Sequence, residues 1–95
     1  MVPDISKISG IGSYATKNDS NRELYFKESS VFLVINPSTI EVRCDQKLSE
    51  NLKEKYESVM ESRYFGRGGI EIVPAGQLST EEIADLIRLS YNITE

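Results

Sequence analysis

Two short stretches between residues 31 and 44 constrain the fold of this chain most. Val31–Ile35 is continuously apolar, which is typical of a strand near the centre of a sheet. In the second stretch Ile40, Val42 and Cys44 alternate with charged residues, and this period of two predicts a strand over residues 39–44 with one buried face. Only three residues separate the two stretches, so we expect the strands to pair antiparallel.

A helix is predicted directly after these strands. Asp45 is well placed as its N-cap. Apolar side chains then recur at spacings of four, four and three, as on one face of an α-helix over about residues 46–61. Carboxylates recur at nearly the same spacing on roughly the opposite side, so we expect a row of them facing water. The apolar set is Leu48, Leu52, Tyr56 and Val59, and the acidic set is Glu50, Glu54, Glu57 and Glu61.

Two further strands and a second helix are predicted elsewhere. Leu24–Lys27 contains aromatic residues that favour strands, and Ile70–Val73 is a short apolar run. Ser79 and Glu82 have the spacing of a capping box, so a last helix is predicted from there to about Tyr91. The face of this helix that we expect to be buried carries Ile83, Leu86, Ile87 and Ser90.

Together these elements predict a single α+β domain spanning residues 1–95. Residues 1–12 are predicted as a weakly structured N-terminal segment, in which Asp4 caps a short helical turn, and residues 18–21 favour a turn. The predicted order is a short helix, three strands, a helix, a strand and a final helix, with a fourth strand left open in the first group. An antiparallel β-sheet covered on one face by two helices would bury the apolar sides of all these elements.

The composition excludes several kinds of catalytic site. The chain has no histidine and Cys44 is its only cysteine, which rules out Ser-His and Cys-His nucleophiles, an intrachain disulfide and a thiolate zinc site. Cys44 lies on the apolar side of its strand, so we expect an inert thiol. We therefore predict that the chain is not an enzyme and uses no cofactor or metal. An enzyme acting through carboxylates, tyrosine or arginine alone stays a minor alternative.

The net charge of −4 comes entirely from the second half of the chain. Residues 1–47 carry six basic and six acidic side chains, whereas residues 48–95 carry five and nine. A net negative domain is not attracted to phosphate backbones, which disfavours nucleic acid as a partner. No positively charged start leads into an apolar stretch, and the longest apolar run, Val31–Ile35, is too short to cross a membrane, so we expect a cytoplasmic protein.

The most unusual local feature is the loop Arg63–Gly69, which is rich in arginine, glycine and aromatic residues. Arginine beside aromatic side chains is typical both of protein-binding hot spots and of base stacking. The loop lacks the Gly-Lys-Ser/Thr of a phosphate loop, and it precedes a strand instead of a helix. A plain structural loop, a protein or peptide contact and a nucleic-acid contact all stay open. The candidate binding residues are Arg63, Tyr64, Phe65 and Arg67.

Several stretches of this chain resemble the MmcQ/YjbR family of small bacterial proteins. Ile40–Asp45 is similar to the family's strand that ends in Leu-Lys-Cys-Asp before a helix. Gly69–Val73 with Ser79–Ile83 is similar to its last strand, turn and helix start, and Leu86–Tyr91 to its terminal helix. The resemblance covers about residues 31–93. It implies a frataxin-like α+β fold of the kind called a double wing, with nucleic-acid binding by analogy of fold.

The chain also departs from the family pattern. Gln46 stands where the family usually has a proline, and the histidines and tryptophan of the family's Gly-Tyr-His and Lys-Arg-His-Trp stretches are absent. The family's long first helix is cut down to a few residues here. Frataxin-like proteins bind iron on an acidic helix-and-edge surface, so the resemblance leaves weak cation binding open for the predicted row of carboxylates.

The leading hypothesis is a small non-enzymatic binding or regulatory domain that recognises an unknown protein or peptide partner through Arg63–Gly69. The alternative is a DNA- or RNA-binding protein of the MmcQ/YjbR type. We expect no membrane association. The chain is expected to be a monomer, or a weak dimer formed through the exposed edge of its sheet.

Overall fold

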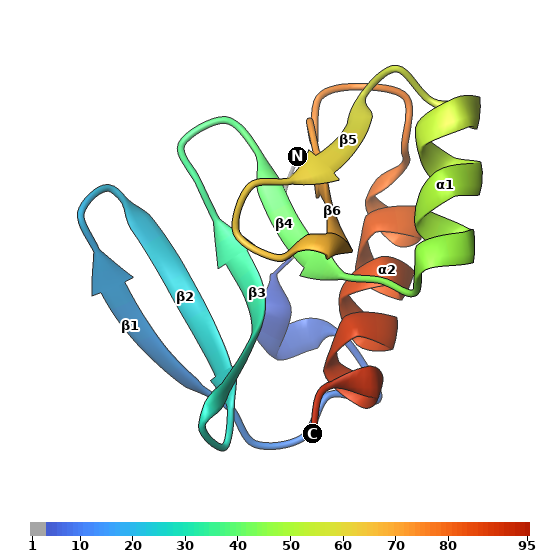
Figure 1. Cartoon of the computed structure of the whole chain (residues 1–95). Coiled ribbons are helices and arrows are strands. Elements are labelled where there is room, and N and C mark those ends of the chain that lie inside the picture. The colour runs from blue at the N-terminus through green and yellow to red at the C-terminus, as the bar shows by residue number, and fades with distance from the viewer. Residues whose placement is uncertain (1–3) are drawn as a thin grey trace.

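One antiparallel sheet of six strands, in the spatial order β1-β2-β3-β4-β6-β5, runs through the computed structural model (Figure 1). The structure describes residues 4–95, so the first three residues of the predicted N-terminal segment lie outside it. Two α-helices complete the fold, which confirms the α+β class. The elements in chain order are the 3-10 helix η1 (Ile5–Lys7), β1 (Ala15–Asp19), β2 (Arg22–Lys27), β3 (Ser30–Ile35), β4 (Ile40–Arg43), α1 (Gln46–Lys55), β5 (Val59–Ser62), β6 (Gly66–Ile72) and α2 (Thr80–Ile93).

The local sequence signals at the helix starts are confirmed. Asp45 caps α1 by accepting a hydrogen bond from the backbone N–H of Leu48 at 3.0 Å. Ser79 and Glu82 form the predicted capping box at α2, because each side chain accepts from the backbone N–H of the other, at 3.1 and 2.9 Å. The Asp4 side chain caps η1 in a similar way. The caps satisfy backbone donors that the first turn of a helix leaves without partners.

The predicted helix over residues 46–61 is wrong over its last six residues. α1 ends at Lys55, and the following residues form β5, so the predicted element order lacks this strand. Val59 continues the helical spacing of apolar residues, yet in the structure it pairs with β6 and is 4% exposed. Because β5 covers the backbone edge of β6, this pairing satisfies groups that a longer helix would have left open. The predicted acidic row is split between α1, with Glu50 and Glu54, and the residues beyond it, with Glu57 and Glu61.

Strand β1 makes four strands before the first α-helix, a number that the prediction left open without locating the extra strand. It pairs with β2 on one side only, and its side chains are mostly exposed, so it has no hydrophobic pattern to reveal it. The turn predicted for residues 18–21 is tighter than expected. Only Ser20 and Asn21 connect the two strands, and Ser20 has a φ of 60°, in the left-handed region that tight hairpins need.

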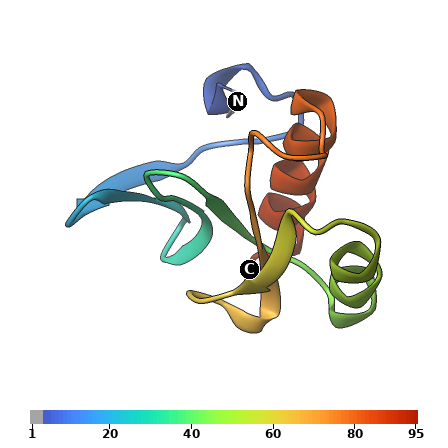
Figure 2. The ribbon, with the colours of Figure 1, turned by 90° about the horizontal axis from the view of Figure 1, so that it is seen from above.

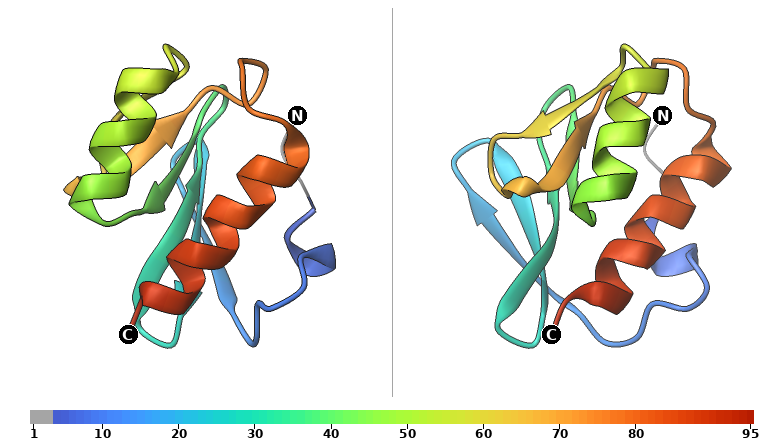
Figure 3. Two further views of the ribbon diagram at one scale, coloured as in Figure 1. Left: turned by 90° about the vertical axis from the view of Figure 1, so that its right-hand side faces the viewer. Right: turned by 45° about the vertical axis from the view of Figure 1, so that its right-hand side comes forward.

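Both helices lie on the same side of the sheet (Figures 2 and 3). α2 packs against β3 and β4, while α1 packs against β5 and β6. Cys44 is buried in the shared core, as predicted. Neither helix within residues 4–95 has the length and apolar character that a membrane crossing requires. The most deeply buried side chains of this core are Phe32, Leu33, Ile40, Val42, Ile70, Ile72, Ile83 and Ile87.

The opposite face of the sheet holds a second, smaller apolar cluster. The β5–β6 hairpin has a register irregularity after Glu61, and its turn brings Phe65 onto this face. Glu41 and Glu71 lie on the same face at directly paired positions of β4 and β6, and they are only 1% and 2% exposed. The alternation in β4 predicts one buried face, whereas the structure buries both. The cluster consists of Leu24, Val31 and Val34, with Phe26 and Phe65 packed against it.

Ser90 joins the last helix to the gap between β3 and β4. The backbone pairing of these two strands stops at Leu33 and Val42. One step further, the Ser90 hydroxyl accepts from the backbone N–H of Arg43 at 2.8 Å and donates to the carbonyl oxygen of Phe32 at 2.6 Å. A side chain that is 0% exposed therefore takes the place of the next hydrogen bond of the sheet.

Candidate functional site

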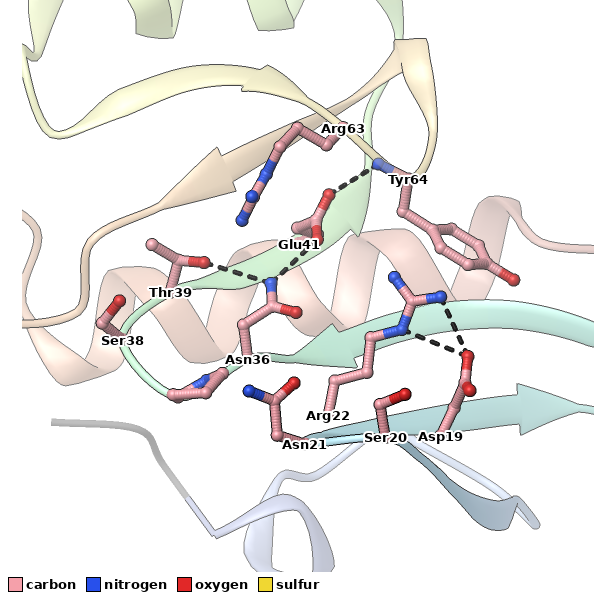
Figure 4. A pocket seen from close by; sticks show the side chains of 11 residues that line it. Asp19, Ser20, Asn21, Arg22, Asn36, Ser38, Thr39, Glu41, Arg63 and Tyr64 are labelled. Atoms are coloured by element: carbon pink, nitrogen blue, oxygen red, sulfur yellow. Dashed lines mark hydrogen bonds and ion pairs between the residues drawn. The ribbon is translucent and has the colours of Figure 1, made fainter.

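A polar depression of about 760 Å³ lies on the face opposite the helices (Figure 4). Three turns surround it: the β1–β2 turn, the β3–β4 turn and the turn of the β5–β6 hairpin. The first two turns lie at the same end of the antiparallel sheet, and the third bends over the face toward them (Figure 1). The lining residues are Asp19, Ser20, Asn21, Arg22, Asn36, Pro37, Ser38, Thr39, Glu41, Arg63 and Tyr64.

Glu41 forms the floor of the depression. One of its carboxylate oxygens accepts from the hydroxyl of Ser62 at 2.7 Å and from the backbone N–H of Tyr64 at 2.8 Å. The other accepts from the side-chain amide of Asn36, also at 2.8 Å. A buried carboxylate needs such donors, because burial without them is costly. Glu41 thus ties the β5–β6 turn to the β3–β4 turn.

Glu71, directly beside Glu41 on β6, holds the side chain of Arg63. The guanidinium donates to both carboxylate oxygens, from Nε at 3.1 Å and from Nη2 at 2.8 Å, and the Thr39 hydroxyl donates a further bond at 2.7 Å. Burial alone would raise the pKa of Glu71, but the hydrogen bonds from Arg63 and Thr39 and the charge of Arg63 outweigh it, and the pKa is lowered. The same contacts raise the pKa of Arg63.

A second arginine is held on the other side of the depression. Arg22 donates from Nε and Nη2 to one oxygen of Asp19, at 3.3 and 2.9 Å, across the β1–β2 turn. Its guanidinium also lies 5.4 Å from the centre of the Tyr64 ring, within the range of a cation–π contact. Tyr64 itself is 39% exposed. The depression therefore presents two fixed guanidiniums on either side of Asn36, with an exposed tyrosine beside them (Figure 4).

The structure separates the four predicted binding residues. Arg63 and Tyr64 line the depression. Phe65 instead packs against the smaller apolar cluster, with the guanidinium of Arg43 5.0 Å from its ring centre. Arg67 lies in a different shallow pocket beside α1.

Sequence reasoning missed most residues that build the depression, among them Arg22, Asn36 and Glu41, and also the Glu71 that holds Arg63. Arg22 belongs to a strand that the pattern places only approximately, and Glu41 and Glu71 look like the solvent side of their strands. The only sequence signal for the two glutamates is that each stands between two apolar residues within a predicted strand. That signal does not show that they are paired.

Internal hydrogen bonds occupy the carboxylates of Glu41 and Glu71. Glu41 in the lining and Glu71 beside it each accept three hydrogen bonds, so neither is arranged as a base aimed at a substrate. No group of three acidic or thiol side chains that could hold a metal ion occurs within residues 4–95. Burial and the charge of Asp45 raise the pKa of the Cys44 thiol to about 11, which keeps it protonated and unreactive at neutral pH.

Comparison of the chain with protein-family models, with curated proteins and with solved structures finds no match. The resemblance to the MmcQ/YjbR family therefore stays a prediction. What this domain does has to be inferred from its own side chains.

Proposed function

We propose that this chain is a small non-enzymatic binding domain that recognises a partner protein at the polar depression. The observation that carries the proposal is the state of Arg63. Its side chain is 76% exposed, yet a carboxylate that is only 3% exposed holds it bidentately at 2.8–3.1 Å. An exposed arginine normally loses side-chain freedom on binding; this one is already ordered, which lowers the cost of association.

The residue types around Arg63 support a protein partner. Arginine, tyrosine and methionine are enriched in protein interfaces, and arginine and tyrosine dominate binding hot spots. Tyr64 is exposed beside Arg63, and Met60, 41% exposed, is the cross-strand neighbour of Glu71 on the same face. Arg22 completes this group. We call Arg22, Met60, Arg63 and Tyr64 the recognition surface.

The charges around the depression argue against the nucleic-acid alternative. The two arginines are matched by two lining carboxylates, Asp19 and Glu41, and the buried Glu71 that holds Arg63 brings the net charge of the group to −1. Nucleic-acid affinity comes largely from unmatched basic groups that neutralise phosphates. A base could still stack on Tyr64, so nucleic acid is an outcome of the test below.

A displayed library of random twelve-residue peptides, selected on the immobilised chain, tests the proposal. Selected peptides are then titrated into ¹⁵N-labelled protein. We expect shift changes centred on Arg22, Asn36 and Tyr64, and about a tenfold or greater loss of affinity in Arg63→Ala. Arg67→Ala is the matched control, because it removes the same charge from the nearby start of β6 but lies in a different pocket.

Two results would overturn the proposal. In the first, selected peptides bind but map to the helices or to the β1 edge, with Arg63→Ala binding as well as the unsubstituted chain. In the second, no peptide binds, while a mixed-sequence single-stranded oligonucleotide binds at low salt with an affinity that falls steeply as salt is added.

A further inference from the structure

The side-chain amide of Asn36 has one fixed orientation, and two buried carboxylates determine it. Glu41, when ionised, only accepts hydrogen bonds, so the atom of Asn36 that faces it at 2.8 Å must be the nitrogen. The Thr39 hydroxyl donates its proton to Glu71 at 2.7 Å, and so it too can only accept from Asn36, at 3.1 Å. Both N–H groups of the amide are therefore used inside the protein.

The carbonyl oxygen of the same amide is consequently directed away from Glu41 and Thr39. No donor within residues 4–95 bonds to it, and the close view shows it turned toward the open space between Arg22 and Asn21 (Figure 4). Asn36 is partly exposed and lines the depression. The depression thus offers a fixed hydrogen-bond acceptor near its centre.

Donors held in place by carboxylates line the same depression as this acceptor. A guanidinium has five N–H donors, and the carboxylates of Asp19 and Glu71 engage Arg22 and Arg63 only through Nε and Nη2. Nη1 of each arginine has no hydrogen-bond partner within the described part of the chain. Two guanidiniums with unused N–H donors therefore line the same depression as the Asn36 acceptor.

We infer that the depression binds the main-chain amides of an extended, uncharged segment of the partner protein. A peptide backbone supplies both kinds of group, carbonyl oxygens for the two arginines and an N–H for Asn36. A carboxylate or phosphate lacks the N–H, and it would meet the carbonyl oxygen of Asn36 and a net charge of −1. This inference rests on the proposed function, and it names the chemistry of the partner.

A backbone-modification scan of one selected peptide tests the inference. Each peptide N–H in turn is replaced by N-methyl, and affinity is measured by calorimetry with the unsubstituted chain and with Asn36→Ala. We expect one N-methyl position to lose about three- to tenfold in affinity, the value of one hydrogen bond. That loss should disappear with Asn36→Ala, because the partner of the N–H is already gone. Asn51→Ala, an exposed asparagine on α1, is the matched control.

Glu41→Gln gives a second route that does not remove Asn36. The glutamine would keep its oxygen toward Ser62 and the Tyr64 N–H and turn its NH₂ toward Asn36. The Asn36 amide would then reverse and present N–H groups to the depression. We expect this variant to lose the sensitivity to that same N-methyl position and to bind sodium phosphate more tightly than the unsubstituted chain does.

The outcomes separate this inference from the proposed function. If peptides map to the depression but every N-methyl position costs the same in Asn36→Ala as in the unsubstituted chain, main-chain recognition is wrong and the binding domain stands. Main-chain recognition is equally wrong if the affinity of the selected peptides depends on aspartate or glutamate side chains. If no peptide maps to the depression, the proposed function itself is wrong.

Discussion

Replacing Ser90 by alanine should destabilise the domain far more than a surface serine would. Two buried backbone groups, the N–H of Arg43 and the carbonyl of Phe32, depend on its hydroxyl. Each such group left without a partner costs about 1–3 kcal/mol, and the better helix propensity of alanine returns about 0.5 kcal/mol. The expected loss is therefore about 2–5 kcal/mol, from a total of about 5–14 kcal/mol for a domain of this length.

Urea unfolding followed by circular dichroism measures this loss. Asn92→Ala, at an exposed position of the same helix, is the control for helix propensity alone. The midpoint of thermal unfolding should fall by about 10 °C or more in Ser90→Ala, at about 4–8 °C per kcal/mol. A free energy of unfolding within about 0.5 kcal/mol of the control would contradict the role given to Ser90, because two buried backbone groups without hydrogen-bond partners should destabilise the fold by more than that.

Hydrogen exchange gives an independent measurement of the same perturbation. The Arg43 amide should be well protected in the native chain, because it donates to a side chain that is 0% exposed. In Ser90→Ala this amide should exchange faster than that of Val42, which lies within the paired part of β4. Equal protection of the Arg43 amide in both proteins would show that the strands close on each other without the serine.

Three further outcomes are expected. Because the pKa of Glu71 is lower in the folded chain than the usual 4.5, its ionised form stabilises the fold fully at pH values above 4.5. This stabilisation is lost as the pH falls through the lowered pKa of the folded state. In an acid titration the free energy of unfolding should therefore fall more steeply in the unsubstituted chain than in Glu71→Gln. The Cys44 thiol should react with a disulfide reagent at pH 7 only slowly in the folded chain and rapidly in urea, since its pKa is about 11. Gly69→Ala should destabilise by more than about 2 kcal/mol, because the new Cβ would lie 2.5 Å from a backbone oxygen of β4. Gly68→Ala, whose Cβ would meet nothing closer than 3.5 Å, should change stability by less than half as much in urea unfolding.

The elements that could be predicted are those with strong local signals. Val31–Ile35 and the alternation after it predict β3 and β4, because a buried face leaves a pattern in neighbouring residues. Capping residues at Asp45 and Ser79 predict the helix starts, because a cap bonds to the backbone three residues away. Both signals involve residues that are only a few positions apart in the sequence.

The elements that could not be predicted depend on distant partners. Val59 fits a helix by its spacing, and only pairing with β6 makes it part of a strand. β1 is exposed on nearly every residue, so only its partner β2 defines it. The candidate site was only half predictable for the same reason. Arg63 and Tyr64 are notable in the sequence, whereas nothing local indicates that Arg22 lies beside them.

The order of amino acids alone is enough to establish an α+β domain with no histidine, one buried cysteine and an arginine–tyrosine turn. The role of that turn depends on the folded chain. When the β5–β6 hairpin bends over the sheet it buries Glu41, which sequence pattern places on the unburied side of its strand. The donors that Glu41 then needs come from residues 5, 21 and 23 positions away. The residues next to a carboxylate in a strand do not indicate such distant partners. Only the three-dimensional arrangement shows that Glu41 orients Asn36 and shapes the depression.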